Sequence, residues 1–176
     1  MAESGASAES RTASVCTSTQ ETIKQEMNKY ILLLLFVLLT ACTQREIFSE
    51  FNSFHNAEWD RLQAIRFEAP VYDISVPYQV SIELRHNDQY PFRNIWLFVE
   101  YQAPSGKMWT DTLGTDLADS YGKWYGKGIS LYSCSFNYQE NVQYPDTGIY
   151  VYTIRHGMRA DVLKGISDVG LRISKE

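Results

Sequence analysis

The sequence predicts an all-β fold, an antiparallel β-sandwich of about seven or eight strands, immunoglobulin-like or jelly-roll-like. From Gln63 onward, β-branched and aromatic residues alternate with polar ones, as they do in strands with one buried face. Turn-forming Pro, Gly, Asn and Asp separate these runs at short intervals. No amphipathic helical pattern of useful length interrupts them. We expect the sandwich to occupy residues 63–176 and to follow a lipoprotein signal peptide.

An apolar run of nine residues, Ile31–Leu39, follows Lys29 near the start of the chain. Crossing a bilayer takes roughly 20 apolar residues, and a buried core helix would show an apolar stripe alternating with polar positions, so neither explanation fits this run. A positive residue, a short apolar stretch and small residues before a cleavage point define a secretory signal. The end of the run, Leu39-Thr40-Ala41-Cys42, resembles the lipobox of bacterial lipoproteins. We therefore predict a signal peptide at 27–41 and a lipidated N-terminal Cys42.

Residues 1–26 are rich in Ser, Thr, Ala and Glu. Such a segment cannot bury enough apolar surface to offset its chain entropy, so it is expected to be disordered or mis-assigned. Met27 is followed directly by Asn28 and Lys29, an ordinary start for a signal peptide. We expect translation to begin at Met27.

Charge and cysteine content restrict the function classes. Residues 43–176 carry 13 Lys and Arg against 17 Asp and Glu, a net charge of −4, and no basic cluster that would bind nucleic acid. Of the three cysteines, Cys16 lies in the extension and Cys42 would carry lipid. Cys134 alone cannot close an internal disulfide, and the sequence shows no histidine partner that would make it a nucleophile. We interpret Cys134 as a small apolar residue of a strand.

The segment 42–62 is predicted to tether the domain to its lipid. Phe48, Phe51 and Phe54 recur every three residues in it, a spacing that fits either one face of a helix or anchor points of a tether that folds down on the domain. We favour the tether. The first clear strand is Tyr78–Arg85, where apolar and polar residues alternate strictly, so one face meets the core and the other meets water.

The next run, Asn94–Tyr101, is almost continuously apolar, as in a central strand. Pro104-Ser105-Gly106-Lys107 predicts a tight turn into a hairpin partner at Met108–Leu113. Residues 113–128 hold four glycines and are expected to form a loop with a short helical turn at 116–120. The remaining predictions are strands at 129–138, 141–144, 149–156 and 169–174, and one or two helical turns at 158–164 ended by Gly165.

Several short motifs carry a resemblance to a known family. They are Tyr90-Pro91, Trp96, Leu117-Ala118-Asp119, Gly122-Lys123-Trp124, Met158-Arg159 and Gly165-Ile166-Ser167-Asp168-Val169-Gly170. Together with the lipobox, they are similar to the gliding-motility lipoproteins of the GldH type found in Bacteroidetes. The resemblance covers most of residues 90–173. It implies an envelope lipoprotein that works with the gliding machinery and its associated protein-secretion system, and it assigns no catalytic residue.

Chemical motifs point away from an enzyme and from a cofactor. The sequence has no Gly-x-Ser-x-Gly motif, and its three histidines are too scattered for a typical zinc site. Carboxylates in a glycine-containing loop suit a hard cation, so Asp111, Asp116 and Asp119 are weak metal candidates. Their spacing is not that of an EF-hand, and we expect them to cap turns instead.

The aromatic content, with four Trp and 12 Tyr, suggests recognition of a partner. We expect Trp96 to lie in the core. The candidate partner-binding residues are Arg93, Trp109, Trp124, Met158, Arg159 and Asp168. The leading hypothesis is a non-enzymatic lipoprotein that binds other envelope proteins; the alternative is a carbohydrate-binding lipoprotein that uses Trp109 and Trp124 as its sugar platform.

The residues after Cys42, Thr43-Gln44-Arg45-Glu46, lack the acidic cluster of surface-exported lipoproteins. We therefore expect the protein to be anchored in the outer membrane and to face the periplasm.

Overall fold

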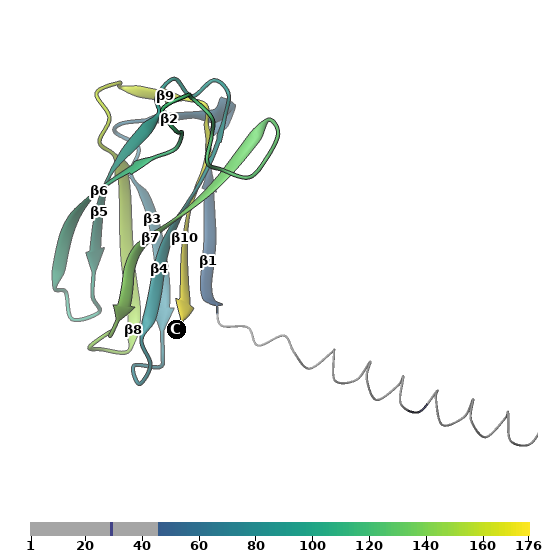
Figure 1. The fold of residues 1–176 in the computed structure, drawn as a ribbon. Helices are drawn as coiled ribbons and strands as arrows, with labels where there is room; N and C mark the ends of the chain where they lie inside the picture. Colours follow the sequence, from purple (N-terminus) through teal and green to yellow (C-terminus); the bar gives the residue numbers. More distant parts are fainter. Residues whose placement is uncertain (1–28, 30–45) are drawn as a thin grey trace, which may run out of the picture. The chain divides into compact units, whose positions relative to one another are not determined.

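The computed structural model describes Lys29 and residues 46–176 (Figure 1). Residues 46–176 fold into two four-stranded antiparallel sheets that enclose a common core, so the predicted antiparallel β-sandwich is confirmed. The first sheet contains, in spatial order, β1 (Glu46–Ser53), β10 (Ile166–Lys175), β4 (Tyr78–Asn87) and β7 (Leu131–Val142). The second contains β3 (Ile65–Val71), β8 (Gly148–His156), β5 (Asn94–Gln102) and β6 (Met108–Asp116).

A small ribbon of β2 (Glu58–Asp60) and β9 (Val162–Lys164) lies at the upper end of the sandwich in Figure 1. The start of β1 and the C-terminus lie together at the lower end, where Glu46 pairs with Ser174. The two ends are therefore distinct, and the chain enters the domain at the lower one.

The tether prediction does not hold for Glu46–Ser53, which form the edge strand β1. This strand pairs with β10 along its length, from Glu46 opposite Ser174 to Ser53 opposite Asp168. A register shift between Glu46 and Phe48 breaks the alternation, and a bulge of this kind hides the period of two that identifies a strand in sequence. Phe48 packs edge-on against Phe67 of the opposite sheet, at 6.5 Å between ring centroids.

Most predicted strands are confirmed, and four local predictions are wrong. The predicted loop at 113–128 begins only after Asp116, because β6 continues to that residue. Residues 141–144 are not a separate strand, since β7 runs unbroken to Val142. The predicted helical turns at 116–120 and 158–164 are absent, and Val162–Lys164 form β9 instead. A left-handed Gly165, at φ +85°, turns β9 into β10.

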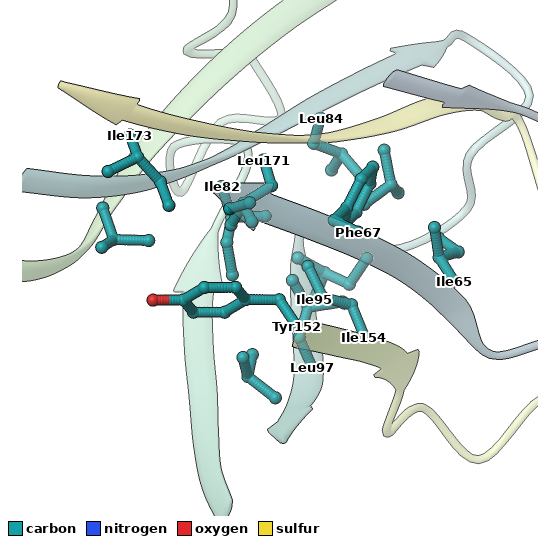
Figure 2. Close-up of a cluster of buried hydrophobic side chains, with 14 of the residues drawn as sticks. Ile65, Phe67, Ile82, Leu84, Ile95, Leu97, Tyr152, Ile154, Leu171 and Ile173 are labelled. Atoms are coloured by element: carbon teal, nitrogen blue, oxygen red, sulfur yellow. The ribbon is translucent and has the colours of Figure 1, made fainter. Parts of the chain in front are cut away.

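The core lies between the two sheets, as Figure 2 shows. The strict alternation of β4 places Tyr78, Val80, Ile82 and Leu84 inside, as predicted. Side chains from both sheets meet there, among them Leu171, Ile173, Ile95, Leu97, Tyr152, Ile154 and Phe67. Burial of this apolar surface is the main term that stabilises the domain.

An aromatic cluster closes the upper end of the sandwich. Trp59 is fully buried, stacks on Phe54 at 5.1 Å between ring centroids, and meets the edge of His156 at 5.1 Å. Its indole nitrogen donates a hydrogen bond to the Gln63 carbonyl oxygen at 3.0 Å. This packing ties β2 to the end of β8 and to the residues that precede β3.

Candidate partner-binding surface

Strand β5 turns two large aromatic side chains toward solvent. Its alternate residues Ile95, Leu97 and Val99 are buried, whereas Trp96 and Phe98 remain 46% and 43% exposed. The expectation of a core position for Trp96 is therefore wrong. A strand centred in its sheet has one face on the core, and its next residue necessarily points to the other face.

Glycines on the neighbouring segments let both rings lie against the sheet. A Cβ atom at Gly114, the residue opposite Trp96 on β6, would stand 2.5 Å from the Trp96 ring. A Cβ at Gly157 would stand 3.0 Å from the Phe98 ring. Glycine in a strand leaves room for close approach of this kind. The rings are thus packed in place while one side stays open to solvent.

Two adjoining hollows lie beside Trp96 and Phe98 on the outward face of β5, at the upper end of the sandwich. The first has a volume of about 450 Å³ and is lined by Phe92, Asn94, Trp96, Gly157, Met158 and Arg159. The second has a volume of about 500 Å³ and is lined by Arg61, Phe98, Arg155, His156, Gly157, Met158 and Arg159. Since they share the segment 157–159, we treat them as one feature, the arginine groove.

The segment that joins the two hollows is fixed to β5. The Gly157 amide donates to the Trp96 carbonyl oxygen at 2.6 Å, and the Trp96 amide donates to Met158 Sδ at 3.4 Å. The first bond continues the pairing of β5 with β8 by one residue beyond Leu97 and His156, and the second ties the Met158 side chain to the backbone of β5. Arg159, which follows directly, is held at the centre of the groove.

The three arginines of the groove differ in their partners. Arg61 forms an ion pair with Asp161 at 2.7 Å, and Arg155 forms one with Glu100. Arg159 is exposed and has neither an ion pair nor a side-chain hydrogen bond with any residue that the structure describes. No carboxylate lines either hollow, so the groove presents positive charge on a protein whose net charge is −5.

The structure brings only part of the predicted partner-binding set together. Met158 and Arg159 lie in the groove, and Arg93 is an exposed neighbour in sequence of two lining residues. Asp168 is half-buried between β1 and β4, where it accepts a hydrogen bond from Ser53 at 2.5 Å and lies 3.9 Å from Arg85. Its contacts are those of a structural residue that ties the edge strand to the sheet.

Trp109 and Trp124 do not offer the free ring faces that a sugar platform needs. Tyr101 stacks on Trp109 at 4.8 Å, and Lys107 Nζ lies 4.7 Å from the ring centre. Trp124 meets His86 edge to face at 4.5 Å and donates through its indole nitrogen to Asp88 at 3.3 Å. The exposed rings of the loop after β6 are tyrosines instead, Tyr121 at 94% and Tyr125 at 64%.

The three aspartates considered for a cation have separate roles. Asp111 accepts a hydrogen bond from the Tyr138 hydroxyl at 2.5 Å, and Asp119 accepts from the Tyr121 and Lys123 amides at 2.8 and 2.9 Å. Asp116 ends β6 opposite Asn94. Within residues 46–176 and Lys29, no three His, Cys, Asp or Glu side chains are grouped to hold a metal ion.

Cys134 has a histidine neighbour that the sequence did not reveal. His86, at the end of β4, places Nε2 3.9 Å from the Cys134 Sγ. Burial raises the pKa of the Cys134 thiol, with a smaller contribution from Glu83, and burial lowers the pKa of His86. Both shifts favour the neutral forms, whereas a nucleophilic thiolate needs the opposite shifts. The pair is part of an aromatic cluster with Trp124 and Tyr132.

Comparison with known proteins places the chain in a family. A family model described as GldH lipoprotein matches residues 46–173, from the first residue of β1 to the last strand. The chain belongs to the GldH lipoprotein family. A gliding motility lipoprotein GldH of Flavobacterium johnsoniae is 33% identical over 157 residues, covering 85% of this chain and 97% of that protein. A gliding motility lipoprotein GldH homolog of Christiangramia forsetii is 31% identical over 161 residues, covering 87% and 98%.

Solved structures are more distant from this GldH-family chain. A structure of infectious bursal disease virus aligns with 73% of the chain and 29% of its own, at 14% identity and a TM-score of 0.32. Such a score is too low to assign a shared fold.

The predicted lipidation site of this GldH-family chain, Cys42, lies outside the described residues. The same holds for the predicted signal peptide apart from Lys29. In the part of the chain that the structure does describe, no helix has the length and apolar character to span a membrane.

Two buried histidines are expected to make the stability of the folded domain depend on pH. Burial lowers the pKa of both His86 and His156, and the His156 ring nitrogens have no hydrogen-bond partner among the described residues. The unfolded chain therefore binds more protons than the native one once the pH falls below the ordinary histidine value of 6.5. Stability is complete above that value and is lost as the pH falls through the native pKa.

We expect the free energy of unfolding to decrease between pH 7.5 and 5.0 by up to about 1.4 kcal/mol per pH unit for each histidine. His156→Leu should make this slope shallower, because one of the two groups is removed. His55→Gln, at an exposed position, should leave it unchanged. Urea denaturation at several pH values measures the slope, and equal slopes in His156→Leu and the unmodified protein would contradict the assignment.

Proposed function

We propose that this chain is a lipid-anchored protein of the cell envelope that works by binding other proteins of a gliding or secretion machinery, without catalysing a reaction. The observation that carries the proposal is membership of the GldH family together with a lipobox cysteine four residues before the folded domain. Two or three acyl chains hold a protein firmly at a bilayer, so the folded domain needs only a recognition surface.

Three features of the described residues support binding as the mode of action. The arginine groove combines ordered aromatic rings with guanidinium groups, the residue types that concentrate binding energy in protein interfaces. The loop after β6 exposes Tyr121 and Tyr125 at the same end of the sandwich. The buried thiol and imidazole of Cys134 and His86 are both held neutral, which does not suit nucleophilic catalysis.

We also propose that the anchor lies in the outer membrane and that the domain faces the periplasm. The residues after Cys42, Thr43-Gln44-Arg45-Glu46, carry no acidic cluster of the kind expected in surface-exported lipoproteins of this phylum. Protease added to intact cells should then leave the domain uncut, and permeabilising the outer membrane should expose it.

Affinity purification from detergent-solubilised envelopes tests the proposal. The tagged full chain is expected to recover a fixed set of envelope proteins in amounts comparable with its own. The matched control carries residues 27–46 fused to an unrelated soluble domain, so it keeps the signal and the anchor but lacks the sandwich. Recovery of the chain alone, or of the same set with the control, would contradict binding by the sandwich domain.

A further inference from the structure

We propose that the arginine groove binds an extended acidic segment of a partner protein, with an aromatic or aliphatic side chain of that segment seated on Trp96 and Phe98 and its carboxylates paired with Arg159 and Arg155. This inference rests on the proposed function and specifies the chemistry of the partner. The residues involved come from β5, β8 and the segment after β8, all at the upper end of the sandwich.

The floor of the groove is apolar and already ordered. Trp96 and Phe98 lie over Gly114 and Gly157, so their rings lose little freedom when a ligand covers their exposed sides. Met158 lines both hollows, and its thioether adapts to an irregular apolar surface. Hollows of about 450 and 500 Å³ are large enough to accept single side chains of a peptide.

The polar groups of the groove determine which peptide fits. Arg159 is charged, exposed and unpaired with the described residues, and guanidinium groups bind carboxylates with two parallel hydrogen bonds. Phe98 and Arg155 are opposite each other on β5 and β8, so an apolar contact and a charged one lie side by side. Glu100 and Asp161 neutralise Arg155 and Arg61 in part, which leaves Arg159 as the main contact for a carboxylate.

Charge also favours an acidic partner at this site. The chain as a whole is acidic, with a net charge of −5, whereas both hollows are lined by arginine and by no carboxylate. Complementarity of this kind sets orientation and specificity more than raw affinity.

The position of the groove favours a protein segment over the anchoring bilayer. Cys42 precedes Glu46 by four residues, so the acyl chains attach within about 14 Å of the start of β1. The groove residues lie where β5 begins and β8 ends, at the upper end of the sandwich, and a strand of nine residues such as β8 spans about 30 Å. The acyl chains are therefore tied to the end of the domain that does not carry the groove.

Selection from a random peptide library, displayed on phage, against the full chain in detergent micelles tests the inference. Enriched peptides should combine Asp or Glu with an aromatic, Leu or Met residue. Arg159→Glu and Trp96→Ala should each weaken the binding of these peptides at least tenfold, as measured by fluorescence anisotropy. Lys127→Glu, which reverses an exposed charge outside the groove, should leave binding within twofold.

Four results would overturn the inference. The first two concern the peptides: no sequence is enriched, or the enriched peptides bind the Arg159→Glu protein as tightly as the unmodified chain. The other two are flotation of the Cys42→Ser chain with phosphatidylglycerol vesicles that depends on Arg159, and a dimer in sedimentation velocity that Arg159→Glu dissociates. The last two would assign the groove to lipid or to a second copy. A fifth would be recovery of the envelope partners by the Arg159→Glu protein, which rejects the groove as the binding site and leaves the proposed function standing. If the unmodified chain recovers no envelope protein in the affinity purification, that result would count against the proposed function itself.

Discussion

Changing Cys42 to serine is expected to release the protein from membranes and to abolish incorporation of labelled palmitate. A hydroxyl cannot form the thioether to diacylglycerol, and cleavage then produces no acylated N-terminus. Each methylene removed from the bilayer costs about 0.8 kcal/mol of binding free energy, so the loss of whole acyl chains leaves no stable attachment. Fractionation of cells into membrane and soluble parts, with metabolic labelling, measures both effects.

Cys134→Ser is the matched control for this experiment. Cys134 is a buried cysteine of β7, so it cannot take part in acylation at the lipobox. The control protein should keep its label and its place in the membrane fraction. Label that persists after Cys42→Ser would refute the lipobox assignment and with it the anchor on which the proposed function depends.

Replacing residues 46–53 with a flexible Gly-Ser linker of the same eight residues is expected to unfold the domain. The linker keeps the reach of a tether but removes β1, exposing the edge of β10 and uncovering Phe67 in the opposite sheet. Native domains are stable by only about 5–15 kcal/mol, and the loss of an entire edge strand with its packing consumes much of that margin. Near-ultraviolet circular dichroism and urea denaturation report the outcome.

The matched control changes exposed side chains and keeps the strand. Glu46 and Glu50 are both exposed in β1, so the double substitution to glutamine should shift the free energy of unfolding by no more than about 0.5 kcal/mol. An unchanged denaturation midpoint in the linker variant would restore the tether hypothesis for this segment.

The arginine groove shows why a binding surface is harder to predict than a strand. The run Asn94–Tyr101 was recognised as a central strand, and β5 indeed pairs with β6 and β8. Its nearly continuous apolar character predicts a central strand but does not show which side chains face outward. If Ile95, Leu97 and Val99 are assigned to the inward face of the strand, its alternation places Trp96 and Phe98 on the outward face. Nothing in the sequence indicates that Arg61, 37 residues earlier than Phe98, lines the same hollow as that ring.

The sequence by itself determined the features that depend on local chemistry. Alternation of apolar and polar residues identifies most strands and the sandwich class, and the short apolar run before Cys42 predicts export and lipidation. Both signals are read from neighbours within about ten residues, which is the range over which propensity and periodicity act.

Only the tertiary structure decided where distant residues meet. The pairing of β1 with β10 converts a segment with a broken period into a strand, because hydrogen bonds to a partner more than 110 residues away outweigh its weak local pattern. The same long-range packing puts His86 beside Cys134 and buries both as neutral groups. It also gathers three arginines around two exposed rings, since strand order, which the local sequence does not encode, determines which side chains share a face.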